Sequence, residues 1–429
     1  MLLALATEGL DPHPLMVLPF VGMLLCIAVM PLLFSHIWER HYPKIALGLG
    51  SICVVYYLWM HGGTRIAGVL EEYVSFIVFI GSLFVVAGGI HIRIQGEARP
   101  LSNCLFLLIG AVLANLIGTT GASMLLIRPW VRSNKYRYTN FHTAFFIFTI
   151  SNVGGCLTPI GDPPLFLGYL KGVPFWWVTQ HCWKAWAFAV VSLVAIFYLF
   201  DRTNFVRAPR AIREMETAHE TFKIEGRRSF LPLAAILVAV IFAPPILREI
   251  IMIASAVIAY RSTPRPIHDA NHFTFGPIKE VAWLFAGIFM TMIPALDYLQ
   301  LHAAALGLNT PEQFYWLSGA LSGVLDNAPT YLAFLSAAFG LKHLDLNNTA
   351  HVAQFLKTDG LYVIAVSLGS VFFGAMTYIG NGPNLMVKSI ADHAKVHTPH
   401  FFAYIFRFSL PVLLPVLAAV AFLLKTGRL

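Results

Sequence analysis

The sequence predicts an all-α polytopic membrane protein, and three observations carry this prediction. Of the 429 residues, 58% are hydrophobic and only 12% are charged, whereas soluble domains are about 25% charged. Apolar runs recur along the chain, and their length is close to the ~20 residues that a spanning helix needs. The 32 Gly and 25 Pro indicate that some of these helices are broken. Such a composition excludes a cytosolic enzyme and a nucleic-acid-binding module.

The apolar runs are of two kinds. Eight are continuous and predict straight crossings at 14–34, 45–61, 73–92, 180–200, 229–243, 249–260, 280–296 and 401–424. Four others are interrupted by Gly, Pro or polar residues. We expect re-entrant hairpins at 101–131 and 314–340, and single broken crossings at 141–171 and 359–392.

The distribution of basic residues predicts the orientation in the membrane. With the N-terminus outside, 20 of the 29 Lys and Arg fall in inner loops and 8 in outer loops, as the positive-inside rule requires. Arg407 is the remaining one and lies within the last span. We therefore expect a multi-pass protein of the cell inner (plasma) membrane, with the N-terminus and C-terminus both outside (periplasmic).

The two halves of the chain contain similar motifs. Thr158-Pro-Ile-Gly-Asp162-Pro and Thr377-Tyr-Ile-Gly-Asn381-Gly-Pro align at one constant offset of 219 residues. We predict two repeats, 1–200 and 230–429, joined by a mixed-charge cytoplasmic linker at 201–229. Each repeat would have five crossings and one hairpin, and this odd number of crossings gives them inverted topology, as in many secondary transporters.

The paired helix breaks provide backbone groups that can bind ions. Proline lacks an amide donor, so a Pro-rich stretch such as 158–164 cannot continue a helix. The freed backbone groups are tolerated at membrane depth only where they face protein or a water-filled cavity. There, helix ends and unwound carbonyls can bind ions. We therefore expect both breaks and both hairpin tips to meet in one central site.

Asp162 and Asp326 are the strongest candidates for ion binding, because an ionisable residue at membrane depth is costly and usually functional. Either carboxylate could hold Na⁺ or a proton, but not both, which would produce antiport. The alternative for each is a capping Asp. Neutral oxygen and amide groups surround them in the sequence, and their alternative role is interhelical hydrogen bonding. This neutral group comprises Asn152, Thr158, Asn327, Thr330, Thr377, Asn381 and Asn384, with Thr119 and Thr120 at the first hairpin tip.

These motifs resemble those of a known family. The stretch SNVGGCLTPIGDPPLFLGYL is similar to the Asn-x-Gly-Gly-x-x-Thr-x-Ile-Gly-x-Pro-Pro signature of the ion transporter superfamily. That superfamily includes dicarboxylate and citrate carriers, arsenite carriers and Nha-type sodium/proton antiporters. YIGNGPNLMVKSIA and LDNAPT resemble its second-repeat motifs, so the resemblance extends over residues 14–424.

The resemblance implies a homodimer with a scaffold part and a moving transport part, which works by elevator-like alternating access. It also implies three groups of binding residues. The first break would contribute Asn152, Thr158, Gly161 and Asp162; the second, Thr377, Gly380, Asn381 and Asn384; and the second hairpin tip, Asp326, Asn327 and Thr330.

Two departures bear on the transported species. The first hairpin reads Gly118-Thr119-Thr120-Gly121, where dicarboxylate carriers resemble one another in having Ser-Asn-Thr. Asp162 replaces the usual Thr and looks like the Ile-Gly-Asp form of the antiporters. Our first hypothesis is therefore Na⁺(Li⁺)/H⁺ antiport, with Na⁺ bound in the region of Asp162 and Asp326. The alternative is a Na⁺- or H⁺-coupled carrier of citrate or another organic anion.

Other functions have less support in the sequence. A membrane enzyme using the two Asp is disfavoured, because they lie in repeat-related hairpin and break elements. We expect no cofactor; Na⁺ and H⁺ are the coupling or transported ions. The expected partners are a small ion or organic anion, the lipid bilayer and a second copy of the chain, with no nucleic acid.

Overall fold

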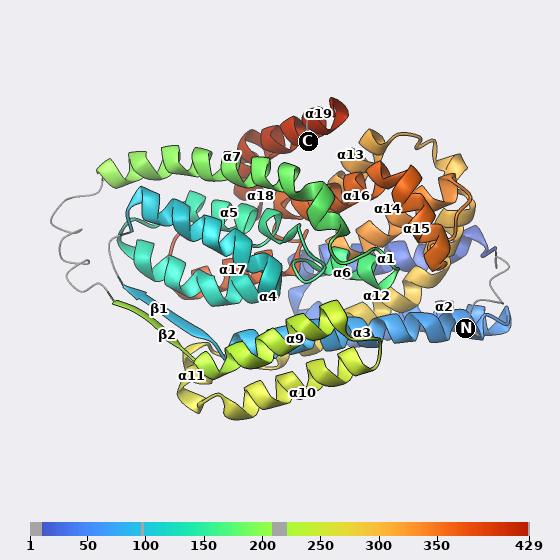
Figure 1. Cartoon of the computed structure of the whole chain (residues 1–429), viewed down its shortest axis with the longest axis horizontal. Helices are drawn as coiled ribbons and strands as arrows, with labels where there is room; N and C mark the ends of the chain where they lie inside the picture. Colours follow the sequence, from blue (N-terminus) through green and yellow to red (C-terminus); the bar gives the residue numbers. More distant parts are fainter. Residues whose placement is uncertain (1–10, 96–97, 208–220, 428–429) are drawn as a thin grey trace.

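The computed structural model describes residues 11–95, 98–207 and 221–427, and these are almost entirely helical (Figure 1). The predicted all-α membrane class is thereby confirmed, with one small exception. Strands β1 (His91–Gln95) and β2 (Thr221–Glu225) pair antiparallel, with His91 opposite Glu225. The sequence analysis did not predict this two-stranded ribbon.

The first half begins with three long helices. A short 3₁₀ turn leads into them, and Phe34 separates the first from the second. They are α1 (Leu18–Leu33), α2 (Ser35–Trp59) and α3 (Gly63–Gly88). A fourth long helix, α7 (Trp177–Arg207), ends this half. The segment between α3 and α7 holds a hairpin and a broken helical segment.

Helix α4 (Pro100–Asn134) folds back on itself at Gly118. Gly118 has φ 78° and ψ 154°, a backbone conformation open to glycine and strained for other residues. The side chains of Asn103 and Asn134 are hydrogen bonded at 2.8 and 3.2 Å. In a straight helix, these two residues would lie about 45 Å apart. The segment therefore has the hairpin geometry that was predicted for 101–131.

The segment predicted as the first broken crossing consists of α5 (Asn140–Thr149), the 3₁₀ turn Val153–Gly155 and α6 (Pro163–Leu170). Pro163 and Pro164 occupy the first turn of α6, where their missing amides cost nothing. The chain between Ser151 and Asp162 is irregular and buried, in the region where a break was expected.

In the second half, too, several helices precede a hairpin and a helix break. This half begins with α9 (Phe230–Phe242), α10 (Leu247–Ser262), the short α11 (Arg265–Ala270) and α12 (Gly276–Leu301). A hairpin follows, made of α13 (Pro311–Ser322) and α14 (Asn327–Leu341). Phe314 and Phe334 on its two arms pack edge to face at 6.0 Å, so the arms lie against each other.

The second broken crossing starts with a sharp bend. Helix α15 (Thr349–Thr358) meets α16 (Gly360–Phe373) at 93°. A 3₁₀ turn at Gly374–Met376 then leads, through irregular chain, to α17 (Gly382–His393). The last crossing is one run of α18 (Phe401–Tyr404), a π-helical stretch (Ile405–Leu413) and α19 (Leu414–Lys425).

Six helices of the described chain are long and apolar enough to span a membrane, and a seventh is added if α15 and α16 form one span. One of the six is α4, which folds back as a hairpin. The other five match predicted straight crossings. Helices α9 and α10 have only 13 and 16 residues, short of the ~20 of a full span.

The helices pack in two groups. In one group, α2 packs on α12 and α1, while α10 packs on α3 and α9. In the other, α16 packs on α13 and α14, and α4 packs on α17 and α7. The groups meet where α12 lies against α14 and α3 lies against α4. Figure 1 shows α9 and α10 on the opposite side of the molecule from α7 and α19.

The predicted linker at 201–229 is only partly a linker. Helix α7 continues to Arg207, and Asp201 is wholly buried instead of solvated. Thr221–Glu225 form β2. Residues 208–220 of the predicted linker lie outside the described residues. The helix continues past residue 200 because Asp201 has buried ion-pair partners that local sequence could not reveal.

Candidate functional site

The polar centre of the molecule is built around Asp162. This residue directly precedes α6, has extended backbone geometry and makes no side-chain cap of that helix. Its carboxylate is completely buried. Since the side chain does not cap its own helix, it is available to groups from other elements.

Three neutral side chains donate hydrogen bonds to Asp162. The Thr119 hydroxyl donates to Oδ1 at 2.7 Å, and the Asn381 amide donates to the same oxygen at 3.1 Å. The Asn327 amide donates to Oδ2 at 2.6 Å. Thr119 lies at the fold-back of α4, Asn327 begins α14, and Asn381 precedes α17. The site thus joins both hairpins and both breaks.

No basic residue among those that the structure describes pairs with this carboxylate. Within the described ranges, the hydrogen-bond partners of the Asp162 carboxylate are all uncharged, and none of the ion pairs involves it. Arg407, the one basic residue predicted within a span, is exposed on the π-helical stretch. An uncompensated buried charge is costly. A carboxylate held in this way is chemically suited to bind a proton or a small cation.

A second set of amides holds the centre in place. Asn381 also donates to the Ser151 carbonyl at 3.1 Å and to Asn152 Oδ1 at 3.2 Å. Asn152 donates to Asn384 Oδ1 at 2.7 Å, and Asn384 donates to the carbonyls of Gly374 and Thr377. All three Asn side chains are buried. The two breaks are therefore tied to each other directly.

The two predicted Thr residues stabilise turns in their own breaks. Thr158 Oγ1 donates to the Asn115 carbonyl at 2.6 Å and accepts from the Gly161 amide at 3.1 Å. Thr377 Oγ1 accepts from the Gly380 amide at 3.2 Å. Both hydroxyls therefore order the backbone three residues ahead of them, and neither touches Asp162.

The two predicted Gly residues allow close backbone approach. A Cβ on Gly161 would lie 2.0 Å from the Gly155 carbonyl oxygen. In the second break, a Cβ on Gly380 would lie 2.6 Å from the carbonyl oxygens of Gly374 and Ser322. The pairs 155/161 and 374/380 have the same 219-residue offset as the motifs. No side chain fits at either crossing point.

Asp326 has a different position from Asp162. It is half-buried and caps α14, with Oδ1 accepting from the Ala328 amide at 3.0 Å. Thr330 Oγ1 donates to the Asp326 carbonyl at 2.9 Å. The neighbouring Asn327, and not Asp326, reaches Asp162. Asp326 therefore has the geometry of a helix-capping Asp, which is the alternative to ion binding given for it in the sequence analysis.

Sequence reasoning missed Asn115. This buried side chain of α4 donates to the Gly154 carbonyl at 2.6 Å, and its Oδ1 accepts from the Leu157 amide at 2.8 Å. It therefore fastens the first break to the first hairpin. The available signal was an Asn in an otherwise apolar run, three residues before Gly118.

A small cavity lies beside the site. It has a volume of about 30 Å³ and is lined by Thr119, Thr120, Gly118 and Gly161, with Phe79 and Leu83 of α3. Pockets for drug-sized ligands are typically ~300–1,000 Å³. In the observed conformation, this space fits a species no larger than a small ion or a water molecule.

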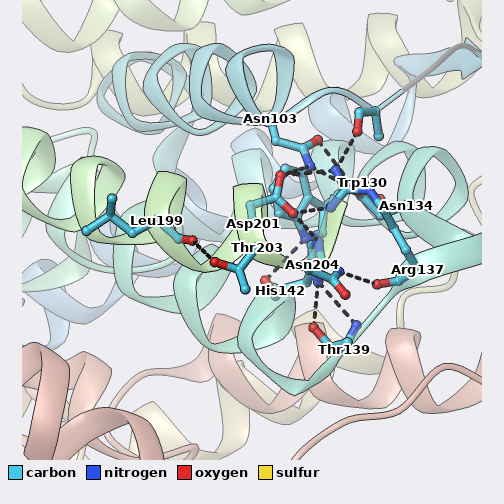
Figure 2. Close-up of polar contacts among 11 residues, drawn as sticks. Asn103, Trp130, Asn134, Arg137, Thr139, His142, Leu199, Asp201, Thr203 and Asn204 are labelled. Carbon is cyan, nitrogen blue, oxygen red and sulfur yellow. Dashed lines mark hydrogen bonds and ion pairs between the residues drawn. The ribbon is translucent and has the colours of Figure 1, made fainter. Parts of the chain in front are cut away.

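A second buried polar cluster lies away from Asp162 (Figure 2). The Asp201 carboxylate of α7 pairs with the Arg137 guanidinium, lies 3.2 Å from His142 Nε2 and accepts from the Asn103 amide at 2.9 Å. Asn134 bonds to Asn103. This cluster holds both ends of the hairpin helix α4 against α5 and α7.

Hairpins and broken helices that meet in a buried polar centre are typical of membrane transporters, and the fold and the site together define a protein of this class. A family model described as putative citrate transport matches residues 11–425. The chain therefore belongs to this transporter family, which confirms the resemblance seen in the sequence.

Curated relatives agree with this assignment. An uncharacterized transporter of Mycobacterium bovis is 25% identical over 317 residues, which cover 70% of this chain and 71% of the relative. An uncharacterized transporter of Mycobacterium tuberculosis matches to the same extent. A 46 kDa membrane protein of Mycobacterium leprae is 23% identical over 317 residues, covering 70% of this chain and 72% of the relative.

Proposed function

We propose that this transporter exchanges Na⁺ or Li⁺ for H⁺, and that Asp162 carries the exchanged ion. The observation that supports the proposal is a buried carboxylate whose hydrogen-bond donors, among the described residues, are all neutral and come from both halves of the chain. One carboxylate can hold a cation or a proton, but not both. Competition for Asp162 then couples the two ion movements in opposite directions.

The neighbouring amides suit both forms of the carboxyl group. An ionised Asp162 only accepts hydrogen bonds, and the Asn327 amide donates to Oδ2 at 2.6 Å. A protonated Asp162 must donate one hydrogen bond. Asn327 can accept it by rotating its side-chain amide, because the amide oxygen and nitrogen exchange places. Binding of Na⁺ at the carboxylate releases the proton, and reprotonation releases the ion.

Alternating access is proposed through relative motion of the two helix groups. The hairpins, broken helices and α7 would form the moving part, and α1–α3 with α9–α12 the scaffold of a homodimer. We further propose that the halves are inverted repeats. The matched breaks at the 219-residue offset support this. The basic-residue distribution supports an orientation with both ends of the chain periplasmic, and membership of a transporter family supports a plasma-membrane location.

The second candidate is a carrier of citrate or another organic anion, which the description of the family favours. Two features favour a small cation over an organic anion as the transported species. The donors of Thr119, Asn327 and Asn381 already converge on Asp162, so they are not available to a substrate carboxylate. The adjoining cavity is only about 30 Å³.

Everted membrane vesicles with a pH-sensitive dye test the proposal. Adding Na⁺ or Li⁺ should collapse a preformed proton gradient with the native protein, and Asp162→Asn should abolish this response. Asp269→Asn, which changes an exposed Asp of α11, should leave it unchanged. A native protein that gives no response to either cation, but takes up labelled citrate, would establish the second candidate instead.

A further inference from the structure

An open groove of about 500 Å³ lies on the surface of the helix group that we propose as the scaffold. It lies between α3, α10 and the start of α12. These are the C-terminal ends of α3 and α10 and the N-terminal end of α12, so the groove opens toward the face that basic residues predict to be cytoplasmic. It is separate from the Asp162 site.

The walls of the groove are apolar and follow helical stripes. Ile77, Gly81 and Val85 line it from α3 at intervals of four residues. Ile253 and Val257 line it from α10, one turn apart, and are 50% and 45% exposed. These side chains are too exposed to belong to the packed core. An apolar chain in the groove would cover them.

A cation lies at the cytoplasmic end of this apolar surface. Arg261 continues the α10 stripe one turn beyond Val257 and lines the groove. It is exposed, and no hydrogen bond or ion pair engages its guanidinium among the residues that the structure describes. The neighbouring Tyr260, 45% exposed, has the amphipathic ring that collects at the headgroup level of a bilayer.

We propose that this groove binds one anionic glycerophospholipid of the cytoplasmic leaflet. Its acyl chain lies between α3 and α10, and its phosphate pairs with Arg261. Guanidinium matches a phosphate with two parallel hydrogen bonds, which an uncharged or apolar partner cannot provide. The apolar walls and the terminal cation therefore match the two parts of one lipid molecule.

A second copy of the chain is a less suitable occupant. Two-fold contacts between identical subunits use the same patch on both sides. A two-fold contact centred on this groove would bring Arg261, which is exposed and lines it, toward its own counterpart. Repulsion between these two guanidinium groups opposes the contact, whereas an anionic headgroup attracts the guanidinium.

Native mass spectrometry of the purified full-length protein tests the proposal. The probes are phosphatidylglycerol and phosphatidylcholine with identical acyl chains. We expect one phosphatidylglycerol to be retained per subunit at saturation, in preference to phosphatidylcholine. Arg261→Gln should weaken its binding about fivefold, and Arg261→Lys should retain most of it. Arg202→Gln, at the exposed end of α7, removes the same charge elsewhere and should have no effect.

A second variant tests the apolar part of the groove. Ala256 lines the groove on α10, and Ala256→Phe should reduce binding of the lipid by filling the space for its chain. Equal binding by the native protein and Arg261→Gln, or equal retention of both lipids, would overturn the proposal. It would also be overturned if Ala256→Phe dissociated the oligomer, since the groove would then be a subunit interface.

Discussion

Asp162 and Asn381 stand at equivalent points of the two helix breaks and are hydrogen bonded to each other at 3.1 Å. Each is the last extended residue before a helix with proline in its first turn, and they are 219 residues apart. The two side chains have nearly the same shape. The two equivalent positions therefore meet in one polar centre. The first half contributes the carboxyl group of Asp162 there, and the second half contributes the neutral amide of Asn381.

Exchanging these two residues should move the charge without removing it. In the double variant Asp162→Asn with Asn381→Asp, one carboxylate remains in the same centre. We expect cation/proton exchange within about tenfold of the native rate, whereas Asp162→Asn alone should be inactive. Dye-monitored exchange in everted vesicles measures both.

The single variant Asn381→Asp provides the matching control. It would place two carboxyl groups in contact, and such a pair cannot both ionise. We expect one of them to remain protonated near neutral pH, which would weaken Na⁺ binding. A double variant as inactive as Asp162→Asn would contradict the equivalence of the two positions for ion binding.

The sequence predicted the features of the site that depend on local chemistry. Proline and glycine in 158–164 and 377–384 require helix breaks, and Gly118 allows the fold-back of α4. The spacing of the motifs also indicated that both breaks contribute equivalent residues. These predictions depend only on the backbone preferences of proline and glycine. For that reason the sequence was sufficient to find Asp162, Asn381 and the hairpin tips.

The choice of partners could not be predicted in this way. Whether Asp326 or Asn327 reaches Asp162 depends on the rotation of α14 in its packing, and the adjacent residues were equally polar. Asp201 was expected to be solvated because charged residues follow it in the sequence. It is buried instead, because it pairs with Arg137, which is distant in the sequence. The β1–β2 ribbon likewise joins segments separated by over a hundred residues.

Gly161→Ala should disrupt the site without changing any polar side chain. The new Cβ would lie 2.0 Å from the Gly155 carbonyl oxygen, and backbone cannot yield as a flexible side chain would. We expect a loss of about 1–3 kcal/mol in stability together with loss of exchange, seen by thermal unfolding and vesicle assay. Gly48→Ala in α2, where nothing lies within 4 Å, is the control and should be harmless.

Asp201→Asn should destabilise the protein strongly, because it leaves Arg137 buried without a carboxylate. Removing one partner of a buried pair typically costs about 3–5 kcal/mol. Removing both, with Arg137→Gln, should cost less than the sum of the single changes. Thermal unfolding of the three variants measures this coupling, and strictly additive losses would show that the pair is not coupled.

The same cluster should not determine ion affinity. Asn103 of the cluster and Thr119 of the site are about 24 Å apart along the first arm of α4. The fraction of Asp201→Asn protein that folds should therefore have a native half-maximal Na⁺ concentration. A large change in that concentration would assign the cluster a part in ion binding.

The response to pH should reveal direct competition at Asp162. When the carboxyl group is mostly protonated, each further unit of acidification should raise the half-maximal Na⁺ concentration about tenfold, since one proton opposes one ion. In the alkaline range, Na⁺ affinity should level off, while turnover falls because the returning, protonated form becomes scarce. Proteoliposomes with set internal and external pH measure both quantities. Asp269→Asn should follow the native curve, and a half-maximal Na⁺ concentration that does not change with pH would rule out competition at a single carboxylate.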